Sequence, residues 1–94
     1  MDNSAAKTIL VIDDEEAIVL LLETILSIYG YRCISCSSPK EAMSMAGNIN
    51  PDLIILDIAM PEVDGYEVCV NLKSNTATRH IPIIMVTALA LIQD

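Results

Sequence analysis

The chain has 94 residues, of which 53% are hydrophobic, and a formal net charge of −8 at pH 7. The hydrophobic content is ample for a packed core and argues against intrinsic disorder. With 13 acidic and 5 basic residues, the chain is a poor candidate for binding nucleic acid or an anionic membrane. No apolar stretch reaches the length of a transmembrane helix, and Met1–Lys7 lacks the regions of a signal peptide. We therefore expect one cytoplasmic domain over residues 1–94.

The first third of the chain predicts a strand, a helix and a second strand. Thr8–Ile12 is an apolar run typical of a buried strand. Glu15–Tyr29 has the i, i+3, i+4, i+7 spacing of a helix face, with apolar residues at Ile18, Leu21, Leu22, Ile25 and Tyr29. Gly30 is suited to end this helix, and Arg32–Ser35 predicts a short second strand.

A second helix is expected to start at Ser38 and to end near Ala46. Ser38 can cap it, Pro39 suits the first helical position, and Glu41 would complete a capping box. The strand that follows is predicted at Leu53–Leu56.

The remaining elements follow the same alternation. Asp64 and Glu67 are spaced as a second capping box, which predicts a helix from there to about Lys73. Ile83–Val86 predicts a fourth strand, and another helix is expected to begin at Ala88. Strands that alternate with helices of this length indicate an α/β fold with a parallel sheet.

Polar side chains directly follow three of the apolar strands. Asp13 and Asp14 come after the first strand, Asp57 after the third and Thr87 after the fourth. Parallel strands deliver such residues to one edge of the sheet, where three carboxylates repel one another and favour a bound cation. A hydroxyl beside them suggests that an oxyanion is held there too. The sequence therefore predicts a functional site at this edge of the sheet.

Three segments, in this order and spacing, resemble the response-regulator receiver domain: Val11–Glu15, Asp57–Gly65 and Ile83–Ala88. The resemblance covers nearly the whole chain. It implies a flavodoxin-like parallel sheet with strand order 2-1-3-4, with the switch point between the first and third strands. It also implies that a fifth strand and a fifth helix would be expected beyond Asp94. We therefore expect a C-terminally incomplete receiver domain, truncated after the fourth strand.

The resemblance also assigns a role to each site residue. It implies that Asp57 is the phosphoacceptor, which takes a phosphoryl group from a histidine kinase or phosphotransfer protein. Asp13, Asp14, Asp57 and the backbone carbonyl of Ala59 would hold Mg²⁺. Thr87 would donate its hydroxyl to a phosphoryl oxygen as the switch residue. Beyond assisting its own phosphoryl transfer and hydrolysis, the domain is not expected to be an enzyme.

Several of these residues also have simpler interpretations. Asp13 or Asp14 could cap the first helix, although capping does not explain two acids. Thr87 could be an ordinary threonine at a strand end, and Asp64 is expected to be a helix cap rather than a ligand. The only histidine, His80, is expected to be solvated.

The C-x-x-C spacing of Cys33 and Cys36 could indicate redox chemistry or half of a metal site. Residues three apart on a strand point to opposite faces, no second C-x-x-C exists, and no helix starts after Cys33. We therefore expect buried or half-buried thiols.

The end of the chain at Asp94 leads to two further expectations. No lysine of the chain occupies the place of the one that receiver domains use to bind the phosphoryl group. Ile83–Val86 would be an apolar edge strand beside an uncovered sheet face, so we expect self-association through this edge, through the uncovered face, or through both.

Two other functions remain open on the sequence. One is a non-catalytic, receiver-derived module for dimerisation or interaction, with impaired output from phosphorylation. The other is an aspartate-nucleophile phosphohydrolase, which is the weaker alternative because Asp57 has no second acid two positions further on.

Overall fold

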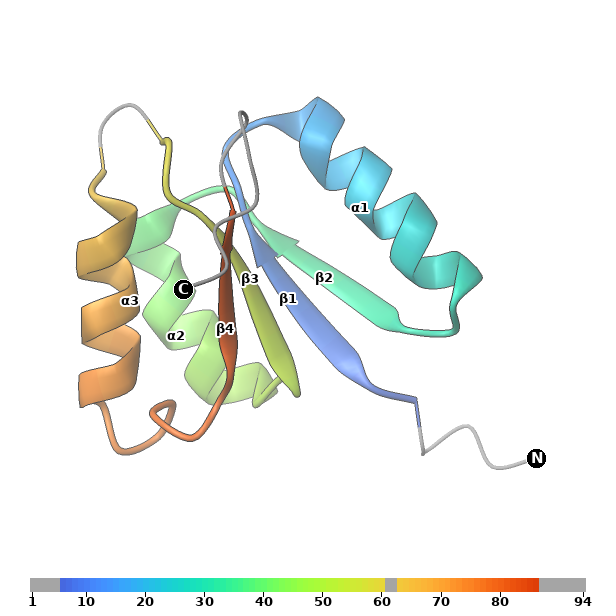
Figure 1. Cartoon of the computed structure of the whole chain (residues 1–94). Helices are drawn as coiled ribbons and strands as arrows, with labels where there is room; N and C mark the ends of the chain where they lie inside the picture. The colour runs from blue at the N-terminus through green and yellow to red at the C-terminus, as the bar shows by residue number, and fades with distance from the viewer. Residues whose placement is uncertain (1–5, 61–62, 87–94) are drawn as a thin grey trace.

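The computed structural model describes residues 6–60 and 63–86, so Thr87 and the helix expected from Ala88 lie outside the described residues. Strands and helices alternate throughout, as predicted (Figure 1). The elements in chain order are β1 (Thr8–Ile12), α1 (Glu16–Ile28), β2 (Arg32–Cys36), α2 (Pro39–Ile49), β3 (Leu53–Asp57), α3 (Gly65–Ser74) and β4 (Ile83–Val86).

The four strands form one sheet in the order β2-β1-β3-β4, and every pairing is parallel. This confirms the predicted flavodoxin-like order. The register places Ile12 opposite Cys36 on one side and Leu56 on the other, and Asp57 opposite Val86. The carboxyl ends of β1 and β3 therefore lie side by side, at the point where the strand order reverses.

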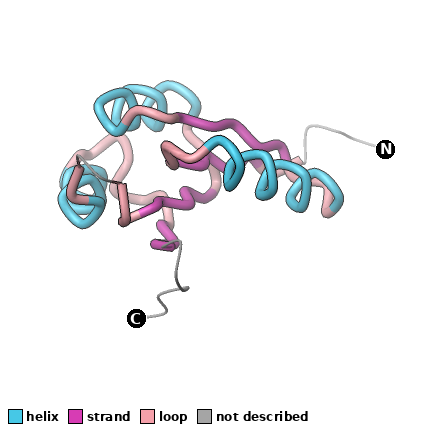
Figure 2. Tube along the Cα trace, turned by 90° about the horizontal axis from the view of Figure 1, so that it is seen from above, coloured by secondary structure: helices cyan, strands magenta, loops and turns pink. Residues whose placement is uncertain are grey.

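Helices α2 and α3 cover one face of the sheet, and α1 lies on the other (Figures 1 and 2). The core forms between the sheet and the α2/α3 pair. Its fully buried members come from strands, helices and the loop before β4: Leu10, Ile12, Ala42, Ala46, Ile54, Leu56 and Leu72, with Ile81 at 1% exposure. Burying a leucine or isoleucine side chain contributes about 1.5–3 kcal/mol, so this face holds most of the stabilising interactions.

Helix α1 differs, because it has no buried residue. It packs mainly on β2, through a half-buried stripe made of Ile18, Val19, Leu22, Glu23 and Leu26. The predicted stripe is therefore wrong at Leu21, Ile25 and Tyr29, which are 55%, 42% and 74% exposed. Apolar residues surround α1 on nearly all sides, so their spacing alone does not reveal which side meets the sheet.

The end of α1 agrees with the prediction. Gly30 has a φ of +86°, in the left-handed region that glycine adopts without strain. Its N–H donates to the carbonyl of Ser27, and the N–H of Tyr31 donates to the carbonyl of Leu26. These two hydrogen bonds are those of a Schellman motif, which satisfies the last carbonyls of the helix.

Two features predicted for α2 are wrong: the side-chain cap at its start and the position of its end. Ser38 is the N-cap residue, but its side chain makes no capping hydrogen bond, and only its carbonyl accepts from the Glu41 N–H. The helix also continues past Gly47 to Ile49, and Asn50 ends it with a φ of +52°. Asparagine tolerates this left-handed conformation, so it can end a helix much as glycine does.

Helix α3 is capped by a side chain, as expected. The Asp64 carboxylate accepts the N–H of Tyr66 at 2.9 Å. The carboxylate therefore satisfies an amide that has no partner within the helix, and it lies where the helix dipole favours a negative charge. Asp64 is a helix cap, as predicted.

The three cysteines are free thiols. Cys36 is buried and donates to the carbonyl of Ser38, and Cys33 is half-buried. Burial raises the pKa of both thiols, with a further contribution from Glu23 at Cys33. The prediction of buried or half-buried thiols is confirmed. None of the described helices is long and apolar enough to cross a membrane.

Candidate metal centre

The three predicted acids come together at the carboxyl edge of the sheet. One carboxylate oxygen each from Asp13, Asp14 and Asp57 lie within 4.8 Å of one another. Asp13 and Asp57 are only 4% and 7% exposed, whereas Asp14 is exposed at the rim. The cluster therefore has two buried members and one that faces solvent.

Strand pairing places these carboxylates. The Asp13 N–H donates to the carbonyl of Cys36 at 3.1 Å, which extends the pairing of β1 with β2 by one residue. Asp57 is the last residue of β3. Because side chains alternate along a strand, Asp13 and Asp57 share the sheet face of Val11 and Ile55, which are opposite each other in the register.

A local hydrogen bond then orients each buried carboxylate. Asp13 Oδ1 accepts the Glu15 N–H, and Asp57 Oδ1 accepts the Ala59 N–H, both at 2.9 Å. This is the turn that aspartate forms with the amide two residues further on. The capping role considered for Asp13 is thus present in a modified form, because the bonded amide belongs to Glu15, the residue that precedes α1.

Burial and like charge both disfavour ionisation of Asp13. Burial, followed by the nearby charges of Asp57 and Asp14, raises its pKa from the ordinary 3.8, the hydrogen bond from the Glu15 amide lowers it, and the net result is a pKa of about 6. A cation at this place would reverse the balance, because it attracts the ionised carboxylates.

The donor set fits Mg²⁺. Carboxylate oxygens are hard ligands, and Mg²⁺ is commonly bound by a few carboxylates while several waters complete its coordination. The exposed position of Asp14 leaves room for such waters at the rim. Asp13, Asp14 and Asp57 would hold the ion, and the Ala59 carbonyl remains a predicted further ligand.

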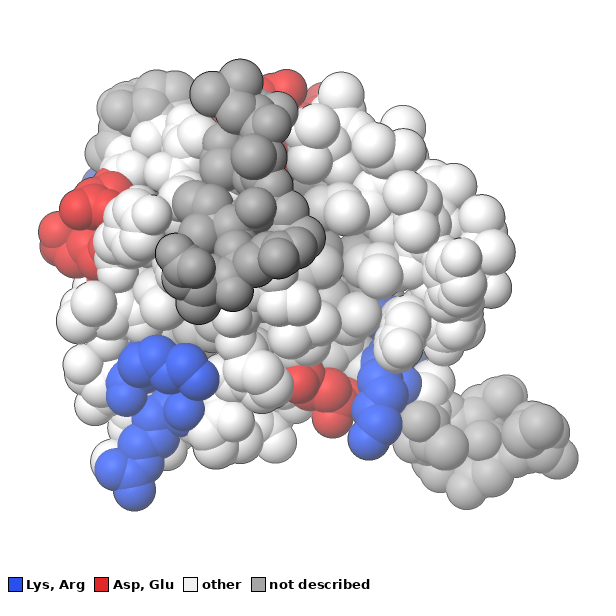
Figure 3. All heavy atoms as spheres, in the orientation of Figure 1, with Lys and Arg blue, Asp and Glu red and all other residues white. Residues whose placement is uncertain are grey.

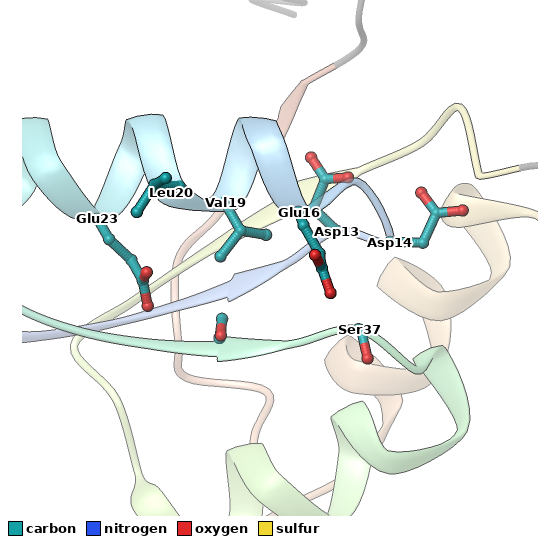
Figure 4. A pocket seen from close by; sticks show the side chains of 8 residues that line it. Asp13, Asp14, Glu16, Val19, Leu20, Glu23 and Ser37 are labelled. Carbon is teal, nitrogen blue, oxygen red and sulfur yellow. The ribbon is translucent and has the colours of Figure 1, made fainter.

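Two depressions adjoin the cluster. The first, of about 430 Å³, runs from Asp13 and Asp14 between α1 and β2. Glu16, Val19 and Glu23 reach from α1 toward β2 along it (Figure 4). This acidic groove was not predicted, because the side of α1 that faces β2 could not be read from the sequence.

The second depression, of about 510 Å³, is lined by Asp14, Met60 and the start of α2, including Lys40. The position of Lys40 beside the site was not predicted from the sequence. The strong helix start at Ser38-Pro39 was the available signal, because a helix that follows β2 begins at the same edge of the sheet as Asp13.

The fold and the acidic cluster together define a parallel α/β domain with a cation site at the reversal of strand order, where such folds bind ligands. The family model for the response regulator receiver domain matches residues 9–94. The chain belongs to this family.

Curated relatives agree. The chain is 48% identical over 86 residues to the "Probable transcriptional regulator ycf27" of Porphyridium aerugineum. The matched region covers 92% of this chain and 35% of that protein. It is 46% identical over 81 residues to "Response regulator PleD" of Caulobacter vibrioides, covering 86% of this chain and 18% of PleD. The chain thus spans about a third or less of the length of these relatives.

Solved structures give the same picture. The N-terminal domain of a response regulator receiver protein from Methanoculleus marisnigri superposes with a TM-score of 0.83 at 43% identity, covering 87% of this chain and 67% of that one. The response regulator TrrA of Thermotoga maritima, solved in complex with Mg²⁺–BeF, gives 0.79 at 38% identity, covering 87% and 70%.

Proposed function

We propose that this domain is the phosphoacceptor of a two-component phosphorelay and that Asp57 receives the phosphoryl group. The donor is a phosphohistidine of a histidine kinase or phosphotransfer protein. The observation that carries the proposal is the convergence of three carboxylates within 4.8 Å, one of them a buried aspartate at the end of a central strand.

Asp57 is favoured over the other two acids as the nucleophile by its position. β3 lies between β1 and β4, so Asp57 has the acids of β1 on one side and the end of β4 on the other. The residue after Asp57, Ile58, donates its N–H to the carbonyl of Val86 at 2.9 Å. Thr87 follows Val86 in the sequence, and its hydroxyl is the proposed donor to a phosphoryl oxygen.

The transfer itself is a nucleophilic displacement. One carboxylate oxygen of Asp57 attacks phosphorus, and an O–P bond forms as the P–N bond of the phosphohistidine breaks. The imidazole nitrogen leaves with the electron pair of that bond and takes up a proton. The hydrogen bond from the Ala59 N–H holds one oxygen of the nucleophile in place, so the attacking group is oriented before the donor arrives.

Asp13 and Asp14 act by charge. They make the site a place for Mg²⁺, which when bound supplies the positive charge that offsets the carboxylates and the phosphoryl oxygens. The complex of TrrA with Mg²⁺–BeF supports this assignment, since that receiver is 38% identical to this chain.

Acetyl phosphate tests the proposal without a cognate kinase. Incubation with Mg²⁺ should add one phosphoryl group, seen by intact mass as an acid-stable, base-labile modification. Asp57→Asn should abolish it, because the amide is not a nucleophile of this kind. Asp52→Asn is the matched control, since Asp52 is an exposed aspartate whose carboxylate accepts the Thr8 N–H, a hydrogen bond that asparagine can also accept.

A protein that is not modified, or one still modified after Asp57→Asn, would contradict the proposal. The first result would favour a non-catalytic interaction module instead.

A further inference from the structure

We infer that Gly65, the first residue of α3, is a positioning residue for the phosphoacceptor. Because it has no side chain, α3 packs directly on the main chain of Ile58 and so holds the turn that orients the Asp57 carboxylate. The inference rests on the proposed function of Asp57 and names a residue outside the acidic cluster on which the reactivity of Asp57 depends.

The close approach of Gly65 to Ile58 leaves no room for a side chain. A Cβ built on Gly65 would overlap the Cα of Ile58 and would lie 2.9 Å from both its Cβ and its Cγ2. Such short distances force atoms to move, and a close approach of two main chains is a recognised use of glycine. Since one of the overlapped atoms is main chain, a change of rotamer at Ile58 cannot relieve the overlap.

Space, rather than backbone conformation, is what position 65 requires. The two glycines outside α3 show the alternatives: Gly30 has a positive φ, and Gly47 has nothing within 4 Å of its added Cβ. Gly65 begins a regular helix and has no positive φ. Alanine is therefore compatible with its dihedral angles, and the three atoms nearest to its Cβ would all belong to Ile58.

The turn, rather than the helix, has to absorb the displacement. Leu72 fixes α3 in the core with no exposed surface, and its carbonyl accepts the buried hydroxyl of Thr78 at 2.6 Å. At the start of the helix, the Asp64 carboxylate holds the N–H of Tyr66. Because Leu72 anchors α3 in the core and Asp64 caps its first turn, a side chain at position 65 pushes mainly on Ile58.

Ile58 transmits that push to the phosphoacceptor. Its own N–H is held by the carbonyl of Val86 at 2.9 Å. Its neighbours on either side, Asp57 and Ala59, share the hydrogen bond that fixes the carboxylate. Hydrogen bonds weaken steeply as they lengthen and bend, so a shift of the Ile58 main chain misdirects the nucleophile while leaving its chemical identity unchanged.

The test compares Gly65→Ala with Gly47→Ala, a second glycine-to-alanine change within a helix. Two quantities are measured: the rate of Asp57 phosphorylation at saturating acetyl phosphate and Mg²⁺, and the amide proton shift of Ala59 by NMR. We expect Gly65→Ala to slow phosphorylation by roughly tenfold or more, since misplacement by about 1 Å can cost 10²-fold. The Ala59 resonance should shift as its hydrogen bond weakens. Gly47→Ala should change neither quantity.

A double variant separates main-chain displacement from side-chain crowding. Adding Ile58→Ala to Gly65→Ala removes Cγ2 of residue 58 but leaves the overlap with its main chain, so the rate should stay low. Full recovery of the rate would overturn the inference.

Asp64→Ala provides a test that adds no atom near Ile58. It loosens the start of α3 by removing the hydrogen bond to Tyr66, so phosphorylation should slow severalfold in a folded protein. If Gly65→Ala does not fold, this variant decides the question.

Two results distinguish the inference from the proposed function. A wild-type rate in folded Gly65→Ala or Asp64→Ala overturns the positioning role and leaves the phosphoacceptor assignment intact. If the wild type itself is not phosphorylated, the proposed function fails, and the Ala59 resonance still reports whether Gly65 holds the turn.

Discussion

The two faces of the sheet are built in opposite ways. Under α2 and α3, Leu10, Ile54 and Leu72 have no exposed surface. On the other face, α1 buries none of its residues and leaves Leu20 and Ile28 64% and 76% exposed. The same alternating strands supply both faces, so the difference lies in what covers them within the described residues.

The location of the acids shows how the difference in packing between the two faces affects the site. Asp13 and Asp57 follow Val11 and Ile55 on the α1 face, as the register requires. The α2/α3 face stabilises the strands rigidly, and the α1 face leaves their carboxyl ends open beside a groove. The loosely packed face therefore opens the site to a groove, while the other face keeps the carboxylates in position.

Truncating a core leucine should give the largest effect. Leu10→Ala leaves a cavity in the α2/α3 face and should lower the free energy of unfolding by about 3 kcal/mol. Leu21→Ala, the same change at an exposed position of α1, should cost less than about 0.5 kcal/mol. Urea denaturation measures both, and equal losses would show that the faces do not differ in stability.

Removing a threonine hydroxyl should give a smaller difference in stability between the two faces. Thr78 is 1% exposed and donates to the Leu72 carbonyl, so Thr78→Val should cost about 1–2 kcal/mol by leaving that buried acceptor unpaired. Thr24 makes the corresponding bond to the Leu20 carbonyl at an exposed position of α1. There water can replace the lost hydroxyl, so Thr24→Val should be nearly neutral in the same denaturation experiment.

The acidic edge between the faces should respond to pH. Asp13 has a pKa raised to about 6, so its contribution to stability is full below the ordinary value of 3.8 and is lost as the pH rises through 6. Asp13→Asn should therefore be more stable than the wild type at neutral pH without Mg²⁺, and the difference should vanish near pH 4. Thermal unfolding across this range measures it.

Mg²⁺ provides the control for this prediction. An ion that binds the folded protein and not the unfolded chain stabilises the fold, so Mg²⁺ should raise the melting temperature of the wild type more than that of Asp13→Asn. A variant stabilised equally at pH 4 and pH 7 would contradict the role assigned to ionisation.

The smallest effect on stability, but a clear effect on association, is expected at the exposed apolar residues. Self-association through the β4 edge or the α1 face remains a prediction, and light scattering after size-exclusion chromatography tests it. Ile84, 41% exposed on β4, and Leu20 on α1 offer one probe for each surface. Ile84→Lys or Leu20→Lys should shift the protein toward the monomer, and a wild type that is monomeric at high concentration would refute the prediction.

The sequence was most informative where a short apolar run ends at a polar residue. β1 and β4 have the predicted bounds, and β2 and β3 differ by one residue. The acids Asp13, Asp14 and Asp57 were found by the same rule, because strand order alone brings strand ends together. Tertiary packing could not be predicted in this way. The start of α3 approaches the turn after β3 where Gly65 meets Ile58, and no periodic pattern in the sequence indicates such a contact.

Helix α1 shows a second feature that could not be predicted from the sequence. Its sequence is apolar on most sides, so the choice of the buried side depends on β2 rather than on the helix. The end of α2 was misjudged for a related reason. The helix was expected to end near Ala46, but the half-buried Ile49 packs against the core and extends the helix.

The two charged residues of α1, Glu16 and Glu23, both point toward β2 (Figure 4). In the space-filling view the region over α1 is accordingly almost free of charged atoms (Figure 3). Ionic strength should therefore act differently on two kinds of encounter. Added salt screens long-range attraction to the acidic edge, whereas binding to the outer side of α1 should persist and should strengthen in sulfate. A partner's salt dependence thus identifies which of these two surfaces it meets first.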